Sequence, residues 1–522
     1  MSAGQGAGVQ PKASADALVS AALEALEVQP RLSPATLQRV ASVVHRPAFD
    51  RRSLRSGIVH LGLGAFMRGH LAAATDAAQE AAFDPAWGIT GVSLRSPATR
   101  DALAPQQGLY TLALRDANGQ SLRVIGSLIE CLVAPDDPAA VLARIAAPEA
   151  RILSLTITEK GYCRDAANGG LMWDHADIAH DLAHPQAPRS AIGYIVRGLA
   201  LRRAVPGAQG GLTLMSLDNL PSNGHTLRAL VLAFAERVDP ALANWIDAHC
   251  SFPNSMVDRI VPRTTPADVA AISAALGAHD AWPVLGEPFF DWAVEDDFVA
   301  GRPDWSVAGA RFVDDAAPWE RLKLRMVNGA HSSIACLGLL AGWATVDEAM
   351  AQPALHDFIQ ALLRDEIEPT LVDLPGLDLA AYRARLLQRF ANPALAHRTA
   401  QIAMDGSQKL PLRLLSTLRD RLRANAPVER IALAIAAWWL HLGGLDERGH
   451  SIAVDDPLAS ALQTWHAQAQ ALATDAERAA HITRFAAIFG DVAESPALVA
   501  ALAQALPALR HCGVVRAIER LA

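Results

Sequence analysis

Short apolar runs rich in β-branched residues alternate with helical patterns over roughly the first 300 residues. Runs of strand length occur at 57–64, 87–95, 152–158 and 211–217, and helical patterns occur at 65–79, 191–205 and 227–250. Strands that alternate with helices indicate βαβ units and a parallel sheet. A further pair of strand-like runs, at 110–114 and 122–129, predicts a hairpin.

The strand signals fade beyond about Asp315, and helical runs joined by short polar links follow. These runs lie at 333–340, 347–363, 379–390, 402–423, 431–442, 458–473 and 497–506. We therefore predict an α/β, Rossmann-like dinucleotide-binding domain over 51–314 and an all-α domain over 315–522, with the active site at their junction. The extension over 1–50 is expected to begin with a flexible tail, 1–12, followed by one or two short alanine-rich helices.

Composition places the chain among globular proteins with an ample core. It has 522 residues, 51% of them hydrophobic and 19% charged, with a net charge of −8. A mildly acidic net charge does not provide the basic surface that binding to nucleic acid requires. Five scattered cysteines without a CxxC pair, and the lack of an HExxH motif, predict reduced thiols and no metal.

The cysteine pattern and the hydropathy of the chain predict a cytoplasmic protein without a membrane segment. The longest apolar run, near 431–440, has about ten residues, whereas a membrane span needs roughly 18. Acidic residues interrupt the apolar stretch within the first 30 residues, and no basic region precedes it. A secretory signal is therefore not expected.

The run at 57–64 ends in a glycine turn formed by Gly62 and Gly64. A strand, a glycine turn and a helix together present free N–H groups to a pyrophosphate, although plain structural turns share this pattern. Met67 stands where a third glycine is usual. The second strand ends at Arg95, with Arg100 nearby and no acid, so these arginines would suit a 2′-phosphate or be surface charges.

Polar residues follow the next two predicted strands directly. Glu159 and Lys160 follow the run at 152–158, and Asp218 and Asn219 follow the run at 211–217. Because the carboxyl ends of parallel strands share one edge of the sheet, where α/β proteins bind ligands, we expect these side chains to lie near the cofactor.

The segment 319–333 combines an amine, an amide and an imidazole within an apolar pattern. On an α-helix, Lys323, Val327 and His331 would form one stripe, and Asn328-Gly329 predicts a local kink. A poorly solvated lysine can act as a general acid or base, and an Asn amide can donate to a carbonyl oxygen that gains charge. The alternative is an ordinary amphipathic helix with a capping Asn and a satisfied core His.

With these residues in view, the chain resembles the long-chain mannitol dehydrogenase family of polyol and sugar-acid oxidoreductases. The motifs that carry the resemblance are Gly62-Leu63-Gly64-Ala65-Phe66 with Arg68 and His70, Thr156-Ile157-Thr158-Glu159-Lys160-Gly161-Tyr162, Ser216-Leu217-Asp218-Asn219-Leu220-Pro221 with Asn223-Gly224, Phe252-Pro253-Asn254-Ser255-Met256-Val257-Asp258-Arg259, and Lys323-Leu324-Arg325 with Asn328-Gly329-Ala330-His331-Ser332. They span roughly residues 57–410 in the order found in the family.

The resemblance implies hydride transfer between a secondary alcohol and a ketone, with a nicotinamide cofactor and no metal. Lys323 matches the catalytic general acid/base, and Asn219 and Asn328 match the pair that polarises the carbonyl. His331 matches a residue that positions the substrate in the family. Glu320 matches a glutamate associated with proton passage to solvent.

Further site residues follow from the same motifs and from the strand ends. Asp258 and Lys409 match substrate-positioning residues. We expect the cofactor to contact Gly62, Gly64, Ala65, Phe66, Arg68, Arg95 and Glu159. The family includes NAD-dependent and NADP-dependent members, and we expect this chain to use NAD. NADP stays open as an alternative because the acidic residue typical of NAD-specific sites is missing near Ala98.

Two positions separate branches of the family. Mannitol-oxidising members tend to have Gly where this chain has Lys160 and Arg where it has Gln401, and the stretch 397–411 resembles the fructuronate reductase branch, which interconverts D-fructuronate and D-mannonate. Lys160 would bind a substrate carboxylate, or it points to solvent. A neutral-polyol dehydrogenase such as mannitol 2-dehydrogenase, a non-catalytic nucleotide-binding protein and a metal-dependent alcohol dehydrogenase remain as alternatives. We expect a monomer that binds a small sugar acid or polyol.

Overall fold

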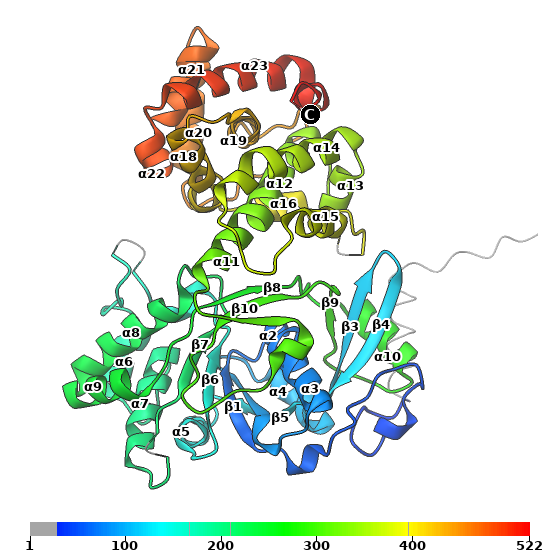
Figure 1. Cartoon of the computed structure of the whole chain (residues 1–522), viewed down its shortest axis with the longest axis vertical. Helices are drawn as coiled ribbons and strands as arrows, with labels where there is room; N and C mark the ends of the chain where they lie inside the picture. Colours follow the sequence, from blue (N-terminus) through cyan, green and yellow to red (C-terminus); the bar gives the residue numbers. More distant parts are fainter. Residues whose placement is uncertain (1–28, 166–167, 209, 395, 522) are drawn as a thin grey trace, which may run out of the picture. The chain divides into compact units, whose positions relative to one another are not determined.

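The computed structural model describes residues 29–165, 168–208, 210–394 and 396–521 (Figure 1). The tail and the alanine-rich helices predicted before residue 29 lie outside these ranges. The chain divides into two compact units, the first ending at Asp315 and the second running over Ala316–Ala522. Strands form the centre of the first unit, and the described part of the second is helical, which confirms the predicted fold class.

A five-stranded parallel sheet organises the first unit. Its strands are β5 (Leu128–Val133), β2 (Gly88–Ser93), β1 (Ser56–Leu61), β6 (Ile152–Leu155) and β7 (Thr213–Ser216), in this spatial order. Leu61 pairs with Val92 on one side and Leu155 on the other, so the carboxyl ends of three strands lie level. The central strands are buried on both faces, which explains why they appear in the sequence as nearly continuous apolar runs.

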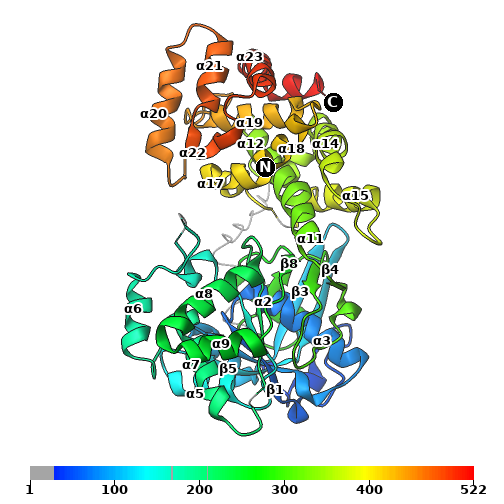
Figure 2. The same cartoon turned by 60° about the vertical axis from the view of Figure 1, so that its left-hand side comes forward.

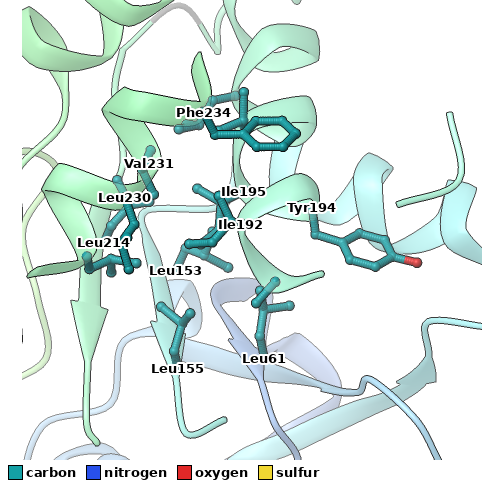
Figure 3. Packing of buried hydrophobic residues seen from close by; sticks show 14 of the residues in the cluster. Leu61, Leu153, Leu155, Ile192, Tyr194, Ile195, Leu214, Leu230, Val231 and Phe234 are labelled. Atoms are coloured by element: carbon teal, nitrogen blue, oxygen red, sulfur yellow. The ribbon is translucent and has the colours of Figure 1, made fainter. Parts of the chain in front are cut away.

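Helices pack on both faces of this sheet. One face carries α5 (Pro138–Ala146), α7 (Ala191–Ala204), α8 (Asn223–Val238) and α9 (Pro240–His249). Figure 3 shows strand side chains such as Leu61, Leu155 and Leu214 packed against Ile192, Ile195 and Phe234 from these helices. Burying each such side chain contributes about 1.5–3 kcal/mol, so this layer fixes the position of the sheet.

The other face carries α2 (Ala65–Gly69) and α3 (Leu71–Ala81). Alternation along β1 explains the two layers, because Val59 and Leu61 face the first layer while Ile58 faces the second. Two small sheets complete the unit. They are β4 (Gly119–Ile125), β3 (Tyr110–Asp116) and β9 (Val284–Gly286), and β11 (Ala310–Val313), β10 (Asp291–Glu295) and β8 (Ser255–Asp258).

In the first unit, three element predictions were wrong in detail. The helix predicted at 65–79 breaks at His70 (φ −118°, ψ −84°), whose ring is buried between those of Phe66 and Phe290. The helix predicted at 227–250 breaks at Asp239 (φ −161°, ψ 107°), because the residue before a proline avoids the α-region. The hairpin of β3 and β4 is confirmed, but the second predicted arm, 122–129, spans the end of β4 and the start of β5.

The second unit contains helices and π-helical turns in its described part. They are α11 (Ala317–Leu322), η7 (Lys323–Gly329), α12 (Ala330–Ala341), α13 (Val346–Met350), α14 (Pro353–Ala361), η8 (Leu362–Ile367), α15 (Leu379–Phe390), α16 (Thr399–Ala403), α17 (Gly406–Leu410), η10 (Pro411–Leu415), α18 (Ser416–Arg423), α19 (Glu429–His441), α20 (Ala459–Gln470), α21 (Asp475–Thr483), α22 (Ala486–Phe489) and α23 (Pro496–Glu519). The nearly all-apolar α19 packs against both α12 and α23 at the centre (Figure 2).

The final helix, α23, is long and apolar enough to span a membrane by length and composition. It exceeds the apolar run at 431–440 that the sequence pattern singled out. Gly513 (φ 78°) kinks it, and it packs against α19 and α21. Core helices pass the same test of length and composition, so this helix alone is weak evidence for a membrane segment.

Candidate active site

The glycine turn after β1 has the geometry that requires glycine. Gly62 has a φ of +103°, and a Cβ placed there would lie 2.0 Å from the carbonyl oxygen of Thr156. Gly64, at the N-cap of α2, has open space instead, with its nearest atom at 3.8 Å. Gly62 is therefore needed for folding, whereas Gly64 leaves room at the start of α2 for a ligand to approach the backbone.

The other predicted residues of this turn have different environments. Arg68 is buried and donates to the carbonyl oxygens of Gly64 and Trp282, so its guanidinium braces the turn from within the fold. The ring of Phe66 stacks on His70 at 5.0 Å. Ala65 is the first residue of α2, where backbone N–H groups lack partners within the helix.

Two arginines follow β2, and within the described ranges one of them, Arg95, forms no ion pair. Arg95 is exposed, whereas Arg100 forms ion pairs with Asp101 and Asp136 at 2.7 and 2.5 Å. Because the charge of Arg100 is already compensated, the pair of arginines predicted to suit a 2′-phosphate is reduced to Arg95.

The ends of β6 and β7 are joined by the carboxylate of Asp218, which was expected near the cofactor but not as a brace between the two strand ends. Asp218 accepts hydrogen bonds from the backbone N–H groups of Ile157 and Thr158 and from the phenol of Tyr162. Thr158 has a φ of +63° and a ψ of 164°, a conformation almost confined to glycine. Asp218 therefore holds a strained turn in place, just before Glu159 and Lys160.

Burial sets the protonation state of this pair. It raises the pKa of the Tyr162 phenol well above its ordinary value, and the charge on Asp218 raises it further. Burial also raises the pKa of Asp218, while the hydrogen bonds it accepts lower it. The phenol thus stays protonated and donates.

Glu159, Lys160 and Asn219 are exposed at this edge of the sheet, as the sequence pattern predicts. Asn223, at the start of α8, donates to the carbonyl oxygens of Ser216 and Ser255 and accepts from the N–H of Ser255. These bonds tie β7 to β8.

Asp258 is the last residue of β8. Only 8% of its surface is exposed, and it pairs across the sheet with Asp291.

In the second unit, Lys323 and Asn328 lie on a π-helical turn, η7, rather than on a regular α-helix. The predicted α-helical stripe through Lys323, Val327 and His331 was therefore wrong. At Asn328-Gly329, where a local kink was predicted, η7 ends and α12 begins, and Gly329 keeps helical backbone angles (φ −65°, ψ −51°). Such π-turns are frequent at functional sites. Lys323 is 6% exposed, and the partly buried Glu320 lies one turn earlier, on α11.

His331 lies on the first turn of α12, stacked on Phe390 at 5.0 Å and edge-on to His397 at 5.1 Å. Burial lowers the pKa of His331 well below its ordinary value, and nearby basic groups lower it further. These are, in decreasing order of effect, His397, whose own pKa is lowered by burial, and the cations Arg389, Arg413 and Lys323. His331 is thus a neutral imidazole among positive charges.

The positive charges around His331 come from separate elements. Arg413, on η10, donates to Ser332 Oγ at 3.2 Å. A Cβ placed on Gly329 would lie 2.9 Å from the carbonyl oxygen of Arg413, so the two π-helical turns approach closely at this glycine. Burial lowers the pKa of Lys409, as does the charge on Arg413. Lys409 Nζ lies 3.8 Å from a carboxylate oxygen of Asp405.

We call Lys323, Arg389, Lys409 and Arg413 the cationic group. The sequence motifs pointed to Lys323 and Lys409 but not to Arg389, Arg413 or the adjacent His397. Arg389 lies in an ordinary amphipathic helix, so it carries no local signal. His397 is the first residue of the stretch 397–411, and Arg413 lies two residues after its end. Both could therefore have been considered as site residues together with that stretch.

Gln401 is exposed on α16 and lines a cavity of about 420 Å³ with Trp438, His441 and Asp455. The lining residue from α12 is Leu339, eight residues after His331 and hence about 12 Å further along that helix. The cavity wall at Gln401 therefore reaches the opposite end of α12 from His331. Within the described ranges, no group of three His, Cys, Asp or Glu side chains could hold a metal ion.

Sequence and structure comparisons place these features in a family. The mannitol dehydrogenase Rossmann domain matches residues 56–307, and the mannitol dehydrogenase C-terminal domain matches residues 315–510. A D-mannonate oxidoreductase from Escherichia coli is 45% identical over 86% of this chain and 92% of its own. A mannitol 2-dehydrogenase from Phaeosphaeria nodorum is 37% identical over 94% of this chain and 87% of its own.

Two solved structures have the same fold. Mannitol 2-dehydrogenase from Pseudomonas fluorescens, in a ternary complex with NAD and D-mannitol, is 39% identical with a TM-score of 0.80, over 94% of this chain and 99% of that one. A D-sorbitol dehydrogenase is 33% identical with a TM-score of 0.83, over 93% of this chain and 100% of that one. The chain therefore belongs to the mannitol dehydrogenase family of oxidoreductases that act on CH–OH groups.

Proposed function

We propose that this protein is an NAD-dependent D-mannonate oxidoreductase, which interconverts D-mannonate and D-fructuronate. The observation that carries the proposal is the cationic group around His331 and the adjacent His397. Lys409 and Arg413 lie close enough that each charge disfavours the other, and Arg389 adds a third positive charge with 7% of its surface exposed. A carboxylate bound there would offset this repulsion, whereas a neutral polyol would not.

The similarity to the D-mannonate oxidoreductase from Escherichia coli supports the same substrate class. The exposed Lys160 is then one of two candidate carboxylate partners, and the cationic group is the better one. Arginine is suited to this role because its planar guanidinium forms two parallel hydrogen bonds with a carboxylate.

We assign the proton transfer to Lys323. In the oxidation, the neutral amine takes the proton of the reacting hydroxyl, and bound NAD⁺ would supply the acceptor for the hydride of the C–H bond. In the reduction, the ammonium returns that proton. Asn328, on the same π-turn, donates an amide N–H to the oxygen that gains charge, and the resemblance assigns the same role to Asn219.

The remaining residues position the substrate and pass the proton on. His331, as a neutral imidazole, exchanges hydrogen bonds with substrate hydroxyls, and we assign Asp258 a similar role. Glu320 would relay the proton to solvent from its place one turn before Lys323. Gln401, at the other cavity, is a weaker candidate for a substrate contact.

The glycine turn and the start of α2 would hold the cofactor pyrophosphate, and a bound nicotinamide would supply the hydride chemistry. Asp218 keeps the adjacent strand end fixed. We propose NAD because Arg100 is already ion-paired, which leaves Arg95 alone to face a 2′-phosphate. No metal is required in this scheme, and we propose that the enzyme works as a monomer in the cytoplasm.

The test is to follow oxidation of NADH and NADPH with D-fructuronate and D-fructose offered separately. We expect kcat/KM for fructuronate with NADH to exceed that for fructose by about 100-fold or more. Turnover of fructose alone would place the protein with the mannitol 2-dehydrogenases instead. If neither ketose caused oxidation of NADH or NADPH, the non-catalytic alternative would be favoured. If a chelator abolished the activity, the metal-dependent alcohol dehydrogenase would be favoured.

A variant separates the cationic group from Lys160. Arg413→Met should raise KM for fructuronate by about 30-fold and leave fructose turnover unchanged. The matched control is Arg419→Met, because Arg419 lies on the neighbouring α18 and pairs with Asp491 at 2.7 Å. If Lys160→Met raised KM and Arg413→Met did not, the carboxylate would belong to the strand end.

A further inference from the structure

A second cavity lies in the first unit, among the helices that cover one face of the sheet. Its volume is about 470 Å³, which lies within the range of small-molecule sites. The lining residues come from α7, α8 and α9 and from α6 (Ala176–Ala183) with the loop after it, helices that lie together in both views (Figures 1 and 2). The walls are mainly apolar: Leu182, Pro188, Val196, Phe234, Val238 and Leu242.

Arg197, on α7, lines this cavity without a counter-ion. Its Nε is buried and has no hydrogen-bond partner in the described part of the chain. No ion pair joins the guanidinium to a carboxylate there either. Buried arginine donors are normally satisfied, and an exception calls for a missing partner. The geometry thus leaves a positively charged donor beside an empty space with apolar walls.

A second arginine reaches the same cavity from α8. Arg237 lies over the ring of Trp173 at 5.0 Å, and no carboxylate within the described ranges pairs with it. Its stacking on an indole leaves the edge of the guanidinium available for an anion. Arg237 and Arg197 therefore bring two positive charges to one cavity.

Asp181 is the acid among the lining residues, and its carboxylate is already engaged. It accepts from the backbone N–H groups of Arg189 and Ser190 and from the hydroxyl of Ser190, at 2.6–2.9 Å. Only 2% of its surface is exposed. Because these bonds commit Asp181 to the start of α7, the two arginines have no counter-ion among the residues that the structure describes.

We propose that this cavity is a second binding site, for a small amphipathic anion: a carboxylate on a short alkyl or aryl body. The arginines would take the carboxylate, and the apolar walls would cover the body. A sugar acid does not fit this description, since the apolar walls offer no partners for its hydroxyls.

The site is separate from the cofactor edge of the sheet. Asn223 begins α8 beside the end of β7, and Arg237 lies 14 residues later, hence about 21 Å further along the helix. Occupation of the cavity would therefore not compete directly with the cofactor.

The test is isothermal titration calorimetry of the full chain with octanoate and benzoate as probes, and with 1-octanol as the neutral counterpart. We expect one octanoate per chain, with 1-octanol bound at least about 10-fold more weakly, because it lacks the charge that the arginines pair with. Absence of saturable binding by both carboxylates would overturn the proposal. Equal affinity for octanoate and 1-octanol would also overturn it, because binding would then depend on the apolar walls alone and not on the arginines.

Variants locate the binding. Arg197→Met and Arg237→Met should each weaken octanoate binding about 10-fold or more, and Ala200→Trp should abolish it by filling the cavity. Arg203→Met is the matched control, because Arg203 lies on α7 but pairs with Asp239. Arg413→Met should leave octanoate binding unchanged. If this variant lost binding, or if Arg203→Met lost as much affinity as Arg197→Met, the carboxylate would bind elsewhere. Circular dichroism and the melting temperature verify that each variant folds.

Discussion

The phenol oxygen of Tyr162 lies 2.8 Å from a carboxylate oxygen of Asp218, and the two residues follow neighbouring strands of the sheet. The same carboxylate accepts the backbone N–H groups of Ile157 and Thr158, and Thr158 adopts a backbone conformation that non-glycine residues rarely hold. Asp218 thus stabilises a strained turn at the edge where parallel sheets bind cofactors.

Replacing Asp218 tests this positioning role. Asp218→Asn keeps the shape of the side chain but replaces one acceptor oxygen with an NH₂ group, which cannot accept from Ile157, Thr158 or Tyr162. We therefore expect the free energy of unfolding to fall by about 1–3 kcal/mol. The affinity for NADH should fall as the turn relaxes. Urea unfolding and NADH fluorescence titration measure the two effects. Tyr162→Phe, which removes one of the three bonds, should show a smaller loss of both; a larger loss would contradict the central role of the carboxylate.

The two glycines of the turn should respond differently to the same substitution. A Cβ at Gly62 would overlap the carbonyl oxygen of Thr156, and the positive φ adds strain, so Gly62→Ala should lower stability by about 2 kcal/mol or more. Gly64→Ala meets no atom within 3.8 Å and should leave the melting temperature almost unchanged. We still expect Gly64→Ala to weaken NADH binding, because the pyrophosphate needs that space. Equal effects of both variants on stability would contradict this division.

Lys323→Ala should reduce kcat by about 1,000-fold or more while leaving the dissociation constant for NADH within about twofold, because the side chain acts on the substrate proton. Steady-state kinetics and fluorescence titration measure these quantities. Arg321→Ala, an exposed neighbour on α11, is the control and should retain its activity. Added primary amines should restore part of the Lys323→Ala rate, and near-full activity without them would remove Lys323 from the mechanism.

His60 should make the first unit sensitive to acid. It is fully buried between Ser154 and Thr156, at 2.8 Å from each hydroxyl, and burial lowers its pKa to about 3. The unfolded chain binds a proton near the ordinary value of 6.5 and the native chain does not, so stability is present above pH 6.5 and falls as the pH drops towards 3.

The size of this effect follows from the pKa difference. Between pH 7 and pH 5 the loss should be about 2 kcal/mol, because the slope approaches 1.36 kcal/mol per pH unit only below pH 6.5. His60→Gln, which keeps a polar side chain but does not titrate, should flatten this part of the curve. Urea unfolding of both proteins at pH 7 and pH 5 checks it, and an equal loss in the variant would assign the acid sensitivity to other groups.

The sequence by itself determined the features whose physical cause is local. The strands and the glycine turn at 57–64 follow from a buried apolar run and from a backbone conformation that glycine adopts without strain. The fading of strand signals near Asp315 separated the two fold types, because alternation and helical periodicity are properties of short windows. The motifs around Lys323 and Asn219 pointed to the family for the same reason.

The tertiary structure alone decided how these residues are held. A π-turn at 323–329 differs from an α-helix in which carbonyl each N–H reaches, and packing rather than composition selects it. Arg389 and Arg413 join Lys323 because α15 and η10 are brought to the start of α12, with Gly329 allowing the close approach. Asp218 became recognisable as a brace only once the ends of β6 and β7 were side by side. Contacts between residues distant in sequence depend on the packing of whole elements, which no local pattern encodes.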